Sequence, residues 1–387
     1  MKHRIAVFIL SFGFVLLLTG CSLRDIYIAP DTPASVPAAP EDSVSHTLLL
    51  IGDAGEASAV TPEATLRVLT QMASERPQRT TILFLGDNLY PQGLPDAADP
   101  QRKEMERRLD EQIRAGTASG ALTLFIPGNH DWEYHRPGGW DAVRRQGEYL
   151  RAQQQQNIVM VPENGQPGPH VTDIGGDLRV IALDTQWWLH AFGKPLYPGD
   201  TDQMQSRRRI TDSLHQLLRT AGSRRVIVAA HHPLCTYGEH GGFFDWKDHL
   251  FPLRKLHPAL WLPLPGLGSL YPLSRMFGIS DQDLSGSENK AMVRAIDSVL
   301  SYHPRAIYVS GHDHTLQVLR SHEERYFVVS GNGVEKHDES LTYGEETMIA
   351  TREKGFIRLQ LLNNGKVRLG VISSAAGGRE AAAVELP

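Results

Sequence analysis

The sequence predicts an α/β fold whose sheet is covered by helices on both faces. Two observations predict it: short runs that are apolar at almost every position recur along the chain, and helical patterns lie between several of them. Strands without polar alternation are typical of sheets that are buried on both faces. The runs that we interpret as strands are TLLLIGD, TILFLGD, LTLFIPGNHD, LRVIALDT, RVIVAAHH and AIYVSGHDH.

Amphipathic helices are expected between these runs, because apolar residues recur there at the spacing of one helix face. The clearest patterns are PEATLRVLTQMAS, QRKEMERRLDEQIRAG and SENKAMVRAIDSVLSYH. After the last of these strands, GFIRLQLLNNGKVRLGVISS predicts a hairpin that turns at residues 363–366.

The composition is that of a globular protein, since 41% of the 387 residues are hydrophobic and 21% are charged. The formal net charge is -5 and no block of like charge occurs, so we expect no nucleic-acid binding. Cys235 is the only cysteine after Cys21, which excludes a disulfide between two cysteines of the folded body.

The N-terminus has the pattern of a secretory signal. Basic residues at positions 2–4 precede an apolar stretch over residues 5–18, and small residues lead to Cys21. The residues LTGC at 18–21 resemble the bacterial lipobox, which implies cleavage before Cys21 and lipidation of its thiol. An uncleaved anchor helix is the alternative, although the apolar stretch is shorter than the ~20 residues that a span needs. Either interpretation places the body outside the cytoplasm. By resemblance to lipoprotein sorting in bacteria with two membranes, Ser22 implies an anchor in the outer membrane, on the periplasmic side.

Two segments differ in composition from the strand and helix pattern. Residues 22–46 are rich in Pro, Ala and Ser, as expected for a tether between a lipid anchor and a folded body. Residues 243–285 are apolar, aromatic and rich in Pro, which suits a lid over the active site, a surface that rests on a bilayer, or extra core. The expected parts are a signal peptide at 1–20, the lipidated cysteine and tether at 21–46, one domain at 47–375 with the insertion 243–285, and a tail at 376–387.

Residues of metal-binding type follow the apolar stretch in five of the six predicted strands. Taken singly, each has another explanation, such as a helix cap, a turn or a solvated histidine. Because the carboxyl ends of parallel strands meet at one edge of a sheet, five such coincidences indicate a shared site. The residues are Asp53 after LLLIG, Asp87 after ILFLG, Asn129 and His130 after LFIPG, His231 after VIVAA, and His312 and His314 after IYVSG.

These ligand types are numerous enough for two metal ions, which can clamp the attacking and leaving oxygens of a displacement at phosphorus. Asp87 is the candidate for a carboxylate shared by both ions. In an extended conformation His312 and His314 would project to the same side, each toward a different ion. Strand alternation alone does not decide between His231 and His232.

The ordered set GDAG, GDNLY, GNHD, VAAH and GHDH resembles the calcineurin-like metallophosphoesterase superfamily. Within it, GDNLY, VIVAAHHP followed by GEHG, and GHDHTLQ resemble the purple acid phosphatase branch, particularly its small, mammalian-type members. The resemblance runs from about Leu48 to Gly333 and is interrupted by the insertion. It implies a two-sheet sandwich flanked by helices, with a dinuclear metal site at the carboxyl ends of strands.

The same resemblance assigns roles to individual residues, and its V-x-x-H motif selects His231. The phenolate of Tyr90 is anionic and hard, so it favours Fe(III) at its own site. The neutral set of Asn129, His231 and His312 suits a divalent ion such as Fe, Zn or Mn. The implied ligands are Asp53, Tyr90 and His314 for the first metal, Asp87 as the bridge, and Asn129, His231 and His312 for the second.

His130 and His240 match family positions that meet the substrate phosphate or protonate the leaving oxygen, a role that suits histidine near neutral pH. An ordinary loop position is the alternative for His240. We expect Asp131 to orient His130 or a ligand, Asp184 to be structural, and Cys235 to be an inert thiol.

The resemblance therefore implies an exported, acid-phosphatase-like phosphomonoesterase that uses a metal-bound hydroxide for in-line attack on a small-molecule phosphoester. A phosphodiesterase or nucleotide hydrolase of the same superfamily is one alternative. A non-catalytic, metal-binding lipoprotein is another.

Overall fold

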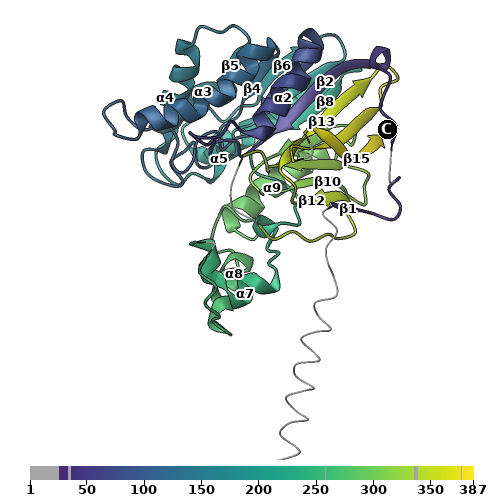
Figure 1. The fold of residues 1–387 in the computed structure, drawn as a ribbon. Helices are drawn as coiled ribbons and strands as arrows, with labels where there is room; N and C mark the ends of the chain where they lie inside the picture. The colour runs from purple at the N-terminus through teal and green to yellow at the C-terminus, as the bar shows by residue number, and fades with distance from the viewer. Residues whose placement is uncertain (1–25, 34–35, 258, 335–338, 376) are drawn as a thin grey trace, which may run out of the picture.

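Two β-sheets pack against each other and helices cover their outer faces in the computed structural model (Figure 1). The structure describes residues 26–33, 36–257, 259–334, 339–375 and 377–387. The two-sheet sandwich flanked by helices is confirmed. The predicted signal peptide and Cys21 lie outside the described residues.

The first sheet has seven strands in the order β15-β14-β13-β2-β3-β4-β5. Its strands β2 to β5 are parallel and the others are antiparallel, and the predicted hairpin joins β13 to β14. The bounds are β2 (Val44–Ile51), β3 (Thr80–Phe84), β4 (Leu122–Phe125), β5 (Ile158–Met160), β13 (Gly355–Leu362), β14 (Val367–Ser373) and β15 (Arg379–Leu386).

The second sheet has eight strands in the order β1-β12-β10-β11-β9-β8-β7-β6, of which β11, β9, β8 and β7 are parallel. The bounds are β1 (Ile26–Ile28), β6 (His170–Ile174), β7 (Leu178–Ala182), β8 (Arg225–Ala229), β9 (Ile307–Ser310), β10 (Leu316–Arg320), β11 (Tyr326–Ser330) and β12 (Thr347–Thr351).

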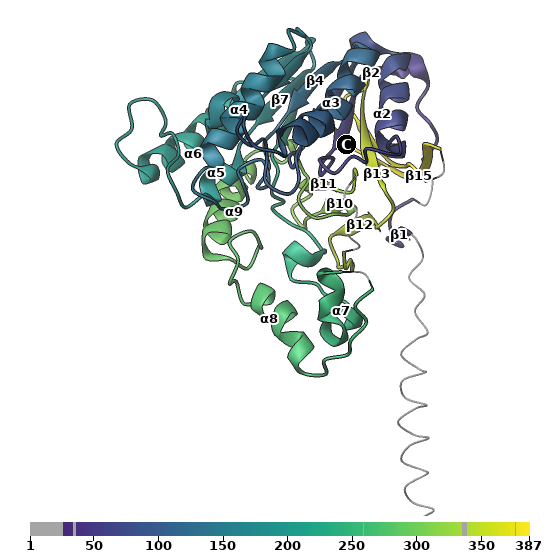
Figure 2. The same cartoon turned by 60° about the vertical axis from the view of Figure 1, so that its left-hand side comes forward.

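The three predicted helices form as α2 (Ala64–Glu75), α3 (Arg102–Ser119) and α9 (Ser287–Leu300). Helices α2, α3 and α4 (Gly139–Ala152) lie beside the first sheet, while α9 packs with α5 (Thr185–Leu189) and α6 (Gln203–Arg219) (Figures 1 and 2). Among the described helices, none has the length and hydropathy to cross a bilayer. Shorter elements are α7 (Trp246–Leu250), α8 (Leu270–Met276), η1 (Glu41–Ser43), η2 (Pro77–Arg79), η3 (Glu163–Gly165), η4 (Glu239–Gly241), η5 (Pro252–Lys255) and η6 (Leu267–Ser269).

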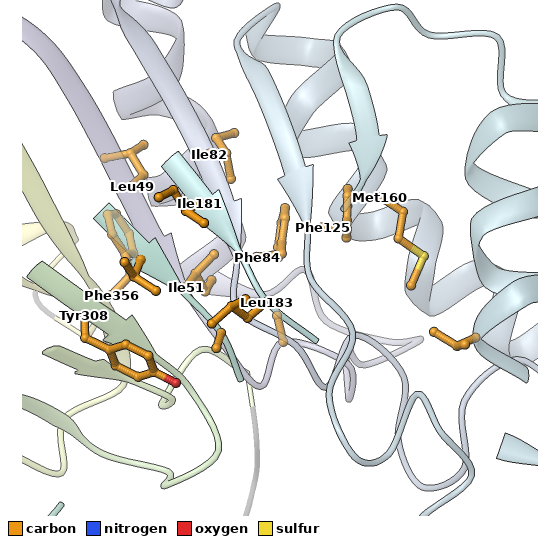
Figure 3. Packing of buried hydrophobic residues seen from close by; sticks show 14 of the residues in the cluster. Leu49, Ile51, Ile82, Phe84, Phe125, Met160, Ile181, Leu183, Tyr308 and Phe356 are labelled. Carbon is orange, nitrogen blue, oxygen red and sulfur yellow. The ribbon is translucent and has the colours of Figure 1, made fainter. Parts of the chain in front are cut away.

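Both faces of the central strands are buried, which explains why these strands lack polar alternation. In β2, Leu48 and Leu50 belong to the cluster between the two sheets, whereas Leu49 and Ile51 belong to the cluster that includes the helices. In the cluster that includes the helices, Phe84 of β3 stacks on Phe125 of β4, with ring centroids 4.5 Å apart (Figure 3). Successive side chains point to opposite faces of a strand, so each face needs its own apolar set.

The structure corrects two of the expected boundaries. The expected tail is not separate from the fold, because β15 within it pairs with β14 at the edge of the first sheet. Part of the expected tether also joins the sheets: β1 pairs with β12, and β2 begins at Val44. Short strands at a sheet edge have weak patterns of their own, because pairing with a neighbour decides whether they form.

Candidate metal centre

The residues expected as ligands come together where strands of both sheets end. Asp53 follows β2, Asp87 and Tyr90 follow β3, and Asn129 follows β4 of the first sheet. The second sheet contributes His231 after β8, with His312 and His314 after β9. The centre thus lies between the two sheets and belongs to both.

One group of donor atoms surrounds the Tyr90 hydroxyl. Its oxygen lies 2.8 Å from Asp53 Oδ1, 3.1 Å from Asp87 Oδ2 and 3.1 Å from His314 Nε2. His314 Nε2 is also 3.4 Å from Asp53 Oδ1. Four side chains from three strand ends therefore present their donor atoms to one point.

A second group surrounds the side-chain oxygen of Asn129. Asn129 Oδ1 lies 2.9 Å from His231 Nε2 and 3.0 Å from His312 Nδ1, and these two nitrogens are 3.1 Å apart. Asp87 Oδ2, the same oxygen that faces Tyr90, is 3.4 Å from His231 Nε2. Asp87 consequently contacts both groups, as a bridging carboxylate must.

The donor set fits two cations. Asp53 and Asp87 are 0% and 1% exposed, and their ion-pair partners among the described residues are histidines. Two buried carboxylates this close repel each other unless positive charge lies between them. One group combines phenol, carboxylate and imidazole, and the other combines amide oxygen and two imidazoles, a difference that suits two different ions.

The other ring nitrogen of each histidine contacts a fixed oxygen, which orients the ring and leaves one nitrogen for a cation. These contacts are His231 Nδ1 with the Leu85 carbonyl at 2.8 Å, His312 Nε2 with the Gln282 carbonyl at 2.9 Å, and His314 Nδ1 with Glu339 Oε1 at 3.0 Å. Burial lowers the pKa of His231, but the charge and hydrogen bond of Asp87, together with the charge of Asp53 and the Leu85 carbonyl, raise this pKa to about 9. A cation must displace that proton, so binding weakens as the pH falls.

Three of the expected ligands have a left-handed backbone: φ is 57° at Asp53, 52° at Asp87 and 70° at His312. Such values are uncommon outside glycine and concentrate at functional sites. The extended conformation expected for His312 and His314 is therefore wrong. A turn, rather than strand alternation, directs His312 to the Asn129 group and His314 to the Tyr90 group.

His232, which strand alternation left open, lies beside the Asn129 group, with one ring nitrogen within 4.8 Å of nitrogens of His231 and His312. Its Nδ1 lies 2.9 Å from Thr185 Oγ1 and its Nε2 lies 2.9 Å from Gln282 Oε1. Burial lowers the pKa of His232 well below its usual value. Both of its nitrogens are thus occupied by neutral partners.

His130 and His240 lie at the mouth of the centre. His130 Nδ1 donates to the Pro91 carbonyl at 2.7 Å, and its Nε2 is 3.9 Å from Asp87 Oδ2. His240 Nδ1 lies 2.9 Å from Asp283 Oδ1. Burial lowers the pKa of His240, but this hydrogen bond and the charges of Asp283 and Asp313 together place the pKa above its usual value. A proton held near neutral pH is what a general acid needs.

Asp131 and Asp184 have structural partners. The Asp131 carboxylate accepts hydrogen bonds from the backbone N–H groups of Gly128 and Asn88, so it holds the two loops that carry Asn129 and Asp87. Asp184 caps α5 and accepts from Trp132 Nε1 at 2.9 Å. Burial raises the pKa of both carboxyls to about 7. Burial also raises the pKa of the Cys235 thiol to about 12, in keeping with an inert thiol.

The motifs at the strand ends and the fold match a known family over most of the chain. A family model of the calcineurin-like phosphoesterases covers residues 46–316. The chain belongs to this family. The sequence matches none of the curated protein sequences with which it was compared.

Solved structures with the same fold have low sequence identity to this phosphoesterase. GAP50, the anchor in the inner membrane complex of Plasmodium, has a TM-score of 0.57 and 16% identity, with 89% of each chain covered. The purple acid phosphatase PPD1 from yellow lupin (Lupinus luteus) seeds has a TM-score of 0.53 and 14% identity, with 88% of this chain and 53% of that chain covered. These likenesses show the fold.

A cavity of about 570 Å³ opens beside the centre of this phosphoesterase and includes residues that the sequence motifs did not indicate. Glu339 contacts His314, and Lys255 forms an ion pair with Glu239. Arg275 donates to Asp283, the partner of His240. Lys255 and Arg275 lie in the insertion and Glu339 lies after β11, so none of the three follows a predicted strand end. The residues of the insertion that line the cavity are Lys255, Tyr271, Arg275, Ser280 and Gln282.

Proposed function

We propose that this chain hydrolyses phosphomonoesters in the manner of an acid phosphatase. The observation that carries the proposal is the position of Asp87 Oδ2, which lies 3.1 Å from Tyr90 Oη and 3.4 Å from His231 Nε2. One carboxylate thus joins two donor groups of different chemistry, as a dinuclear centre requires. The proposed occupants are Fe(III) in the Tyr90 group and a divalent Fe, Zn or Mn ion in the Asn129 group.

When bound, the two cations activate the attacking water and neutralise the phosphoryl oxygens. The protein's own part is to orient the ester and to supply a proton to its leaving oxygen. His240 suits the second task, because Asp283 holds its Nδ1 and Arg275 holds Asp283. His130 is the other candidate, since its Nδ1 is engaged by the Pro91 carbonyl and its Nε2 faces Asp87.

The test is phosphate release by the purified full-length chain from a panel of monoesters, diesters and nucleotides. Asp87→Asn and His231→Ala should lower the rate by roughly 10²-fold or more, together with the metal content. Asp212→Asn and His322→Ala, which alter exposed residues, are the matched controls. Undiminished hydrolysis in both Asp87→Asn and His231→Ala contradicts the proposal. If the chain prefers diesters or nucleotides, the activity is that of a phosphodiesterase or nucleotide hydrolase instead of a phosphomonoesterase. Full metal content without turnover favours a non-catalytic, metal-binding protein.

We also propose that the chain is exported and anchored by a lipid on Cys21 to the outer membrane, on the periplasmic side. The signal pattern and the LTGC sequence support this location. Growth with labelled palmitate should label the wild type and leave Cys21→Ser unlabelled. Equal labelling of the two proteins rejects the lipid anchor.

A further inference from the structure

The insertion, residues 243–285, exposes large apolar side chains to an unusual extent. Thirteen of the nineteen exposed large hydrophobic residues among the described part of the chain belong to it. Extended exposed apolar surface on a folded protein marks a site of interaction. The residues are Phe243, Trp246, Leu256, Leu260, Trp261, Leu262, Leu267, Leu270, Tyr271, Leu273, Met276, Phe277 and Ile279.

The insertion also reverses the usual distribution of polar and apolar groups. In its described part, the buried residues are small or polar: Asp248, Gly268, Pro272, Gln282 and Asp283. No residue classed as exposed there is an acid, a lysine or an arginine. Extra core, one of the three expected roles, is therefore wrong. An apolar phase that covers this surface meets few formal charges, and dehydration of an unpaired ion costs several kcal/mol. The half-buried Arg254 guanidinium lies 4.3 Å from the centroid of the Trp261 ring.

The insertion projects from the body, and it does so on the side where the described chain begins. In both views α7 and α8 lie beyond the two sheets at the lower end of the molecule, and β1 lies on the same lower side (Figures 1 and 2). Ile26, the first residue of β1, follows Cys21 by five positions. Five extended residues reach at most about 18 Å, so a lipid on Cys21 would keep this side of the molecule near the bilayer.

We propose that the insertion docks on the surface of a phospholipid bilayer, with its exposed apolar side chains among the headgroups and upper acyl chains. Trp246 and Trp261, which are 61% and 53% exposed, would lie at the interface that tryptophan prefers. The depth expected for such an apolar face is about 5–10 Å. The inference rests on the proposed lipid anchor and not on the hydrolase activity.

The insertion is at the same time a wall of the metal-centre cavity, through Lys255 and Arg275. A docked insertion would therefore hold the mouth of the cavity close to the membrane surface. It would also restrain rotation about the anchor, because a single lipid-bearing residue and a separate apolar surface give two points of attachment.

Tryptophan quenching by brominated lipids tests the proposal on the lipidated, full-length chain in phosphatidylcholine vesicles. Brominated acyl chains should lower the emission of the wild type, and Trp246→Phe/Trp261→Phe should remove most of this bromine-dependent loss. Trp140→Phe, which alters the body of the protein, should retain it. The four other tryptophans lie in the body, and Trp132 and Trp187 are 0% exposed.

The remaining outcomes each reject the inference in a distinguishable way. Equal emission in brominated and unbrominated vesicles that carry the protein rejects docking and leaves the anchor intact. A chain that does not float with the vesicles rejects both the anchor and docking. If bromine has no effect and Leu260→Ser/Leu262→Ser/Phe277→Ser converts a detergent-solubilised dimer to a monomer, a second copy covers the surface instead. Phosphate release from the same vesicles reports on the proposed function independently.

Discussion

The Tyr90 hydroxyl lies within hydrogen-bonding distance of three buried or half-buried polar side chains. Asp53, Asp87 and His314 all place a donor atom within 3.1 Å of it, and Tyr90 itself is 8% exposed. A tyrosine that only packs against its neighbours needs at most one partner for its hydroxyl. The arrangement supports the proposed role of Tyr90 as a ligand.

Replacement of Tyr90 by phenylalanine should remove visible colour. A phenolate bound to Fe(III) gives an absorption band, so the iron-loaded wild type should be coloured and Tyr90→Phe colourless at equal iron content. Tyr302→Phe, which alters an exposed residue, should keep the band. The readout is the visible spectrum with iron measured per chain. A colourless wild type with full iron would show that Tyr90 packs against its neighbours and does not bind iron.

His46 of β2 should make the fold sensitive to acid. Burial lowers its pKa from 6.5 to about 4, and its Nε2 lies 3.0 Å from Thr81 Oγ1. Between these two pH values the unfolded chain binds a proton that the folded chain does not, so stability is present above pH 6.5 and is lost as the pH falls toward 4. The slope is about 1.4 kcal/mol for each pH unit.

His46→Gln keeps a polar partner for Thr81 and removes the titration. Urea unfolding between pH 4 and 6.5 should therefore show a smaller pH dependence in this variant than in the wild type. His322→Ala, at a residue whose ring is 76% exposed, should leave the dependence unchanged. Parallel slopes in the wild type and His46→Gln would contradict the assignment to His46.

Glycines at the strand ends allow the elements to meet closely enough to build the centre. A Cβ on Gly52 after β2 would lie 2.9 Å from Gly311 Cα after β9, so the two sheets could not approach as they do. A Cβ on Gly128 after β4 would lie 2.2 Å from Asp87 Oδ1 and 2.4 Å from Asp87 N. Side chains at these positions would displace the loops that carry the ligands.

Gly128→Ala should consequently move Asp87 and reduce both metal content and turnover. The loss should be roughly 10-fold or more in metal affinity, the size found when the support of a metal ligand is removed. Gly193→Ala is the matched control, because a Cβ there meets nothing within 4 Å. Metal per chain, turnover and melting temperature are measured for both. Normal metal affinity in Gly128→Ala would show that the loop adapts.

At the scale of the whole molecule, Arg368 ties the C-terminal strand to the start of the described chain. Its guanidinium, on a side chain that is 1% exposed, forms an ion pair with Glu380 of β15. It also donates to the carbonyls of Pro37 and Val36, each at 3.0 Å. The buried Arg368 guanidinium thus binds both the segment expected as a tether and the segment expected as a tail.

Glu380→Gln should lower the free energy of unfolding by about 3 kcal/mol, because it removes the charged partner of a buried arginine. Glu385→Gln on the same strand should change it by less than about 1 kcal/mol, since its pair with Lys366 is exposed. Denaturant unfolding measures both, and turnover should stay unchanged in both. Similar stabilities for the two variants would mean that Arg368 finds other partners.

The sequence alone determined the central strands β2, β3, β4, β7, β8 and β9, the hairpin of β13 and β14, and the helices α2, α3 and α9. Apolar runs and helical spacing are local properties. Apart from Tyr90, which the family resemblance supplied, each expected ligand closely follows its strand, so a correct strand assignment already places it at the right edge. His231 came from the family motif rather than from strand alternation, and the structure directs it to Asn129 as that motif implies.

Only the tertiary structure decided the contacts between segments distant in sequence. Glu339 beside His314 and the Gln282 carbonyl beside His312 join residues that no periodicity relates, and β15 exists because β14 offers it an unpaired edge. The outward direction of the apolar side chains in the insertion is likewise a result of packing. Composition reports how apolar a segment is, whereas the rest of the fold decides which of its faces is left uncovered.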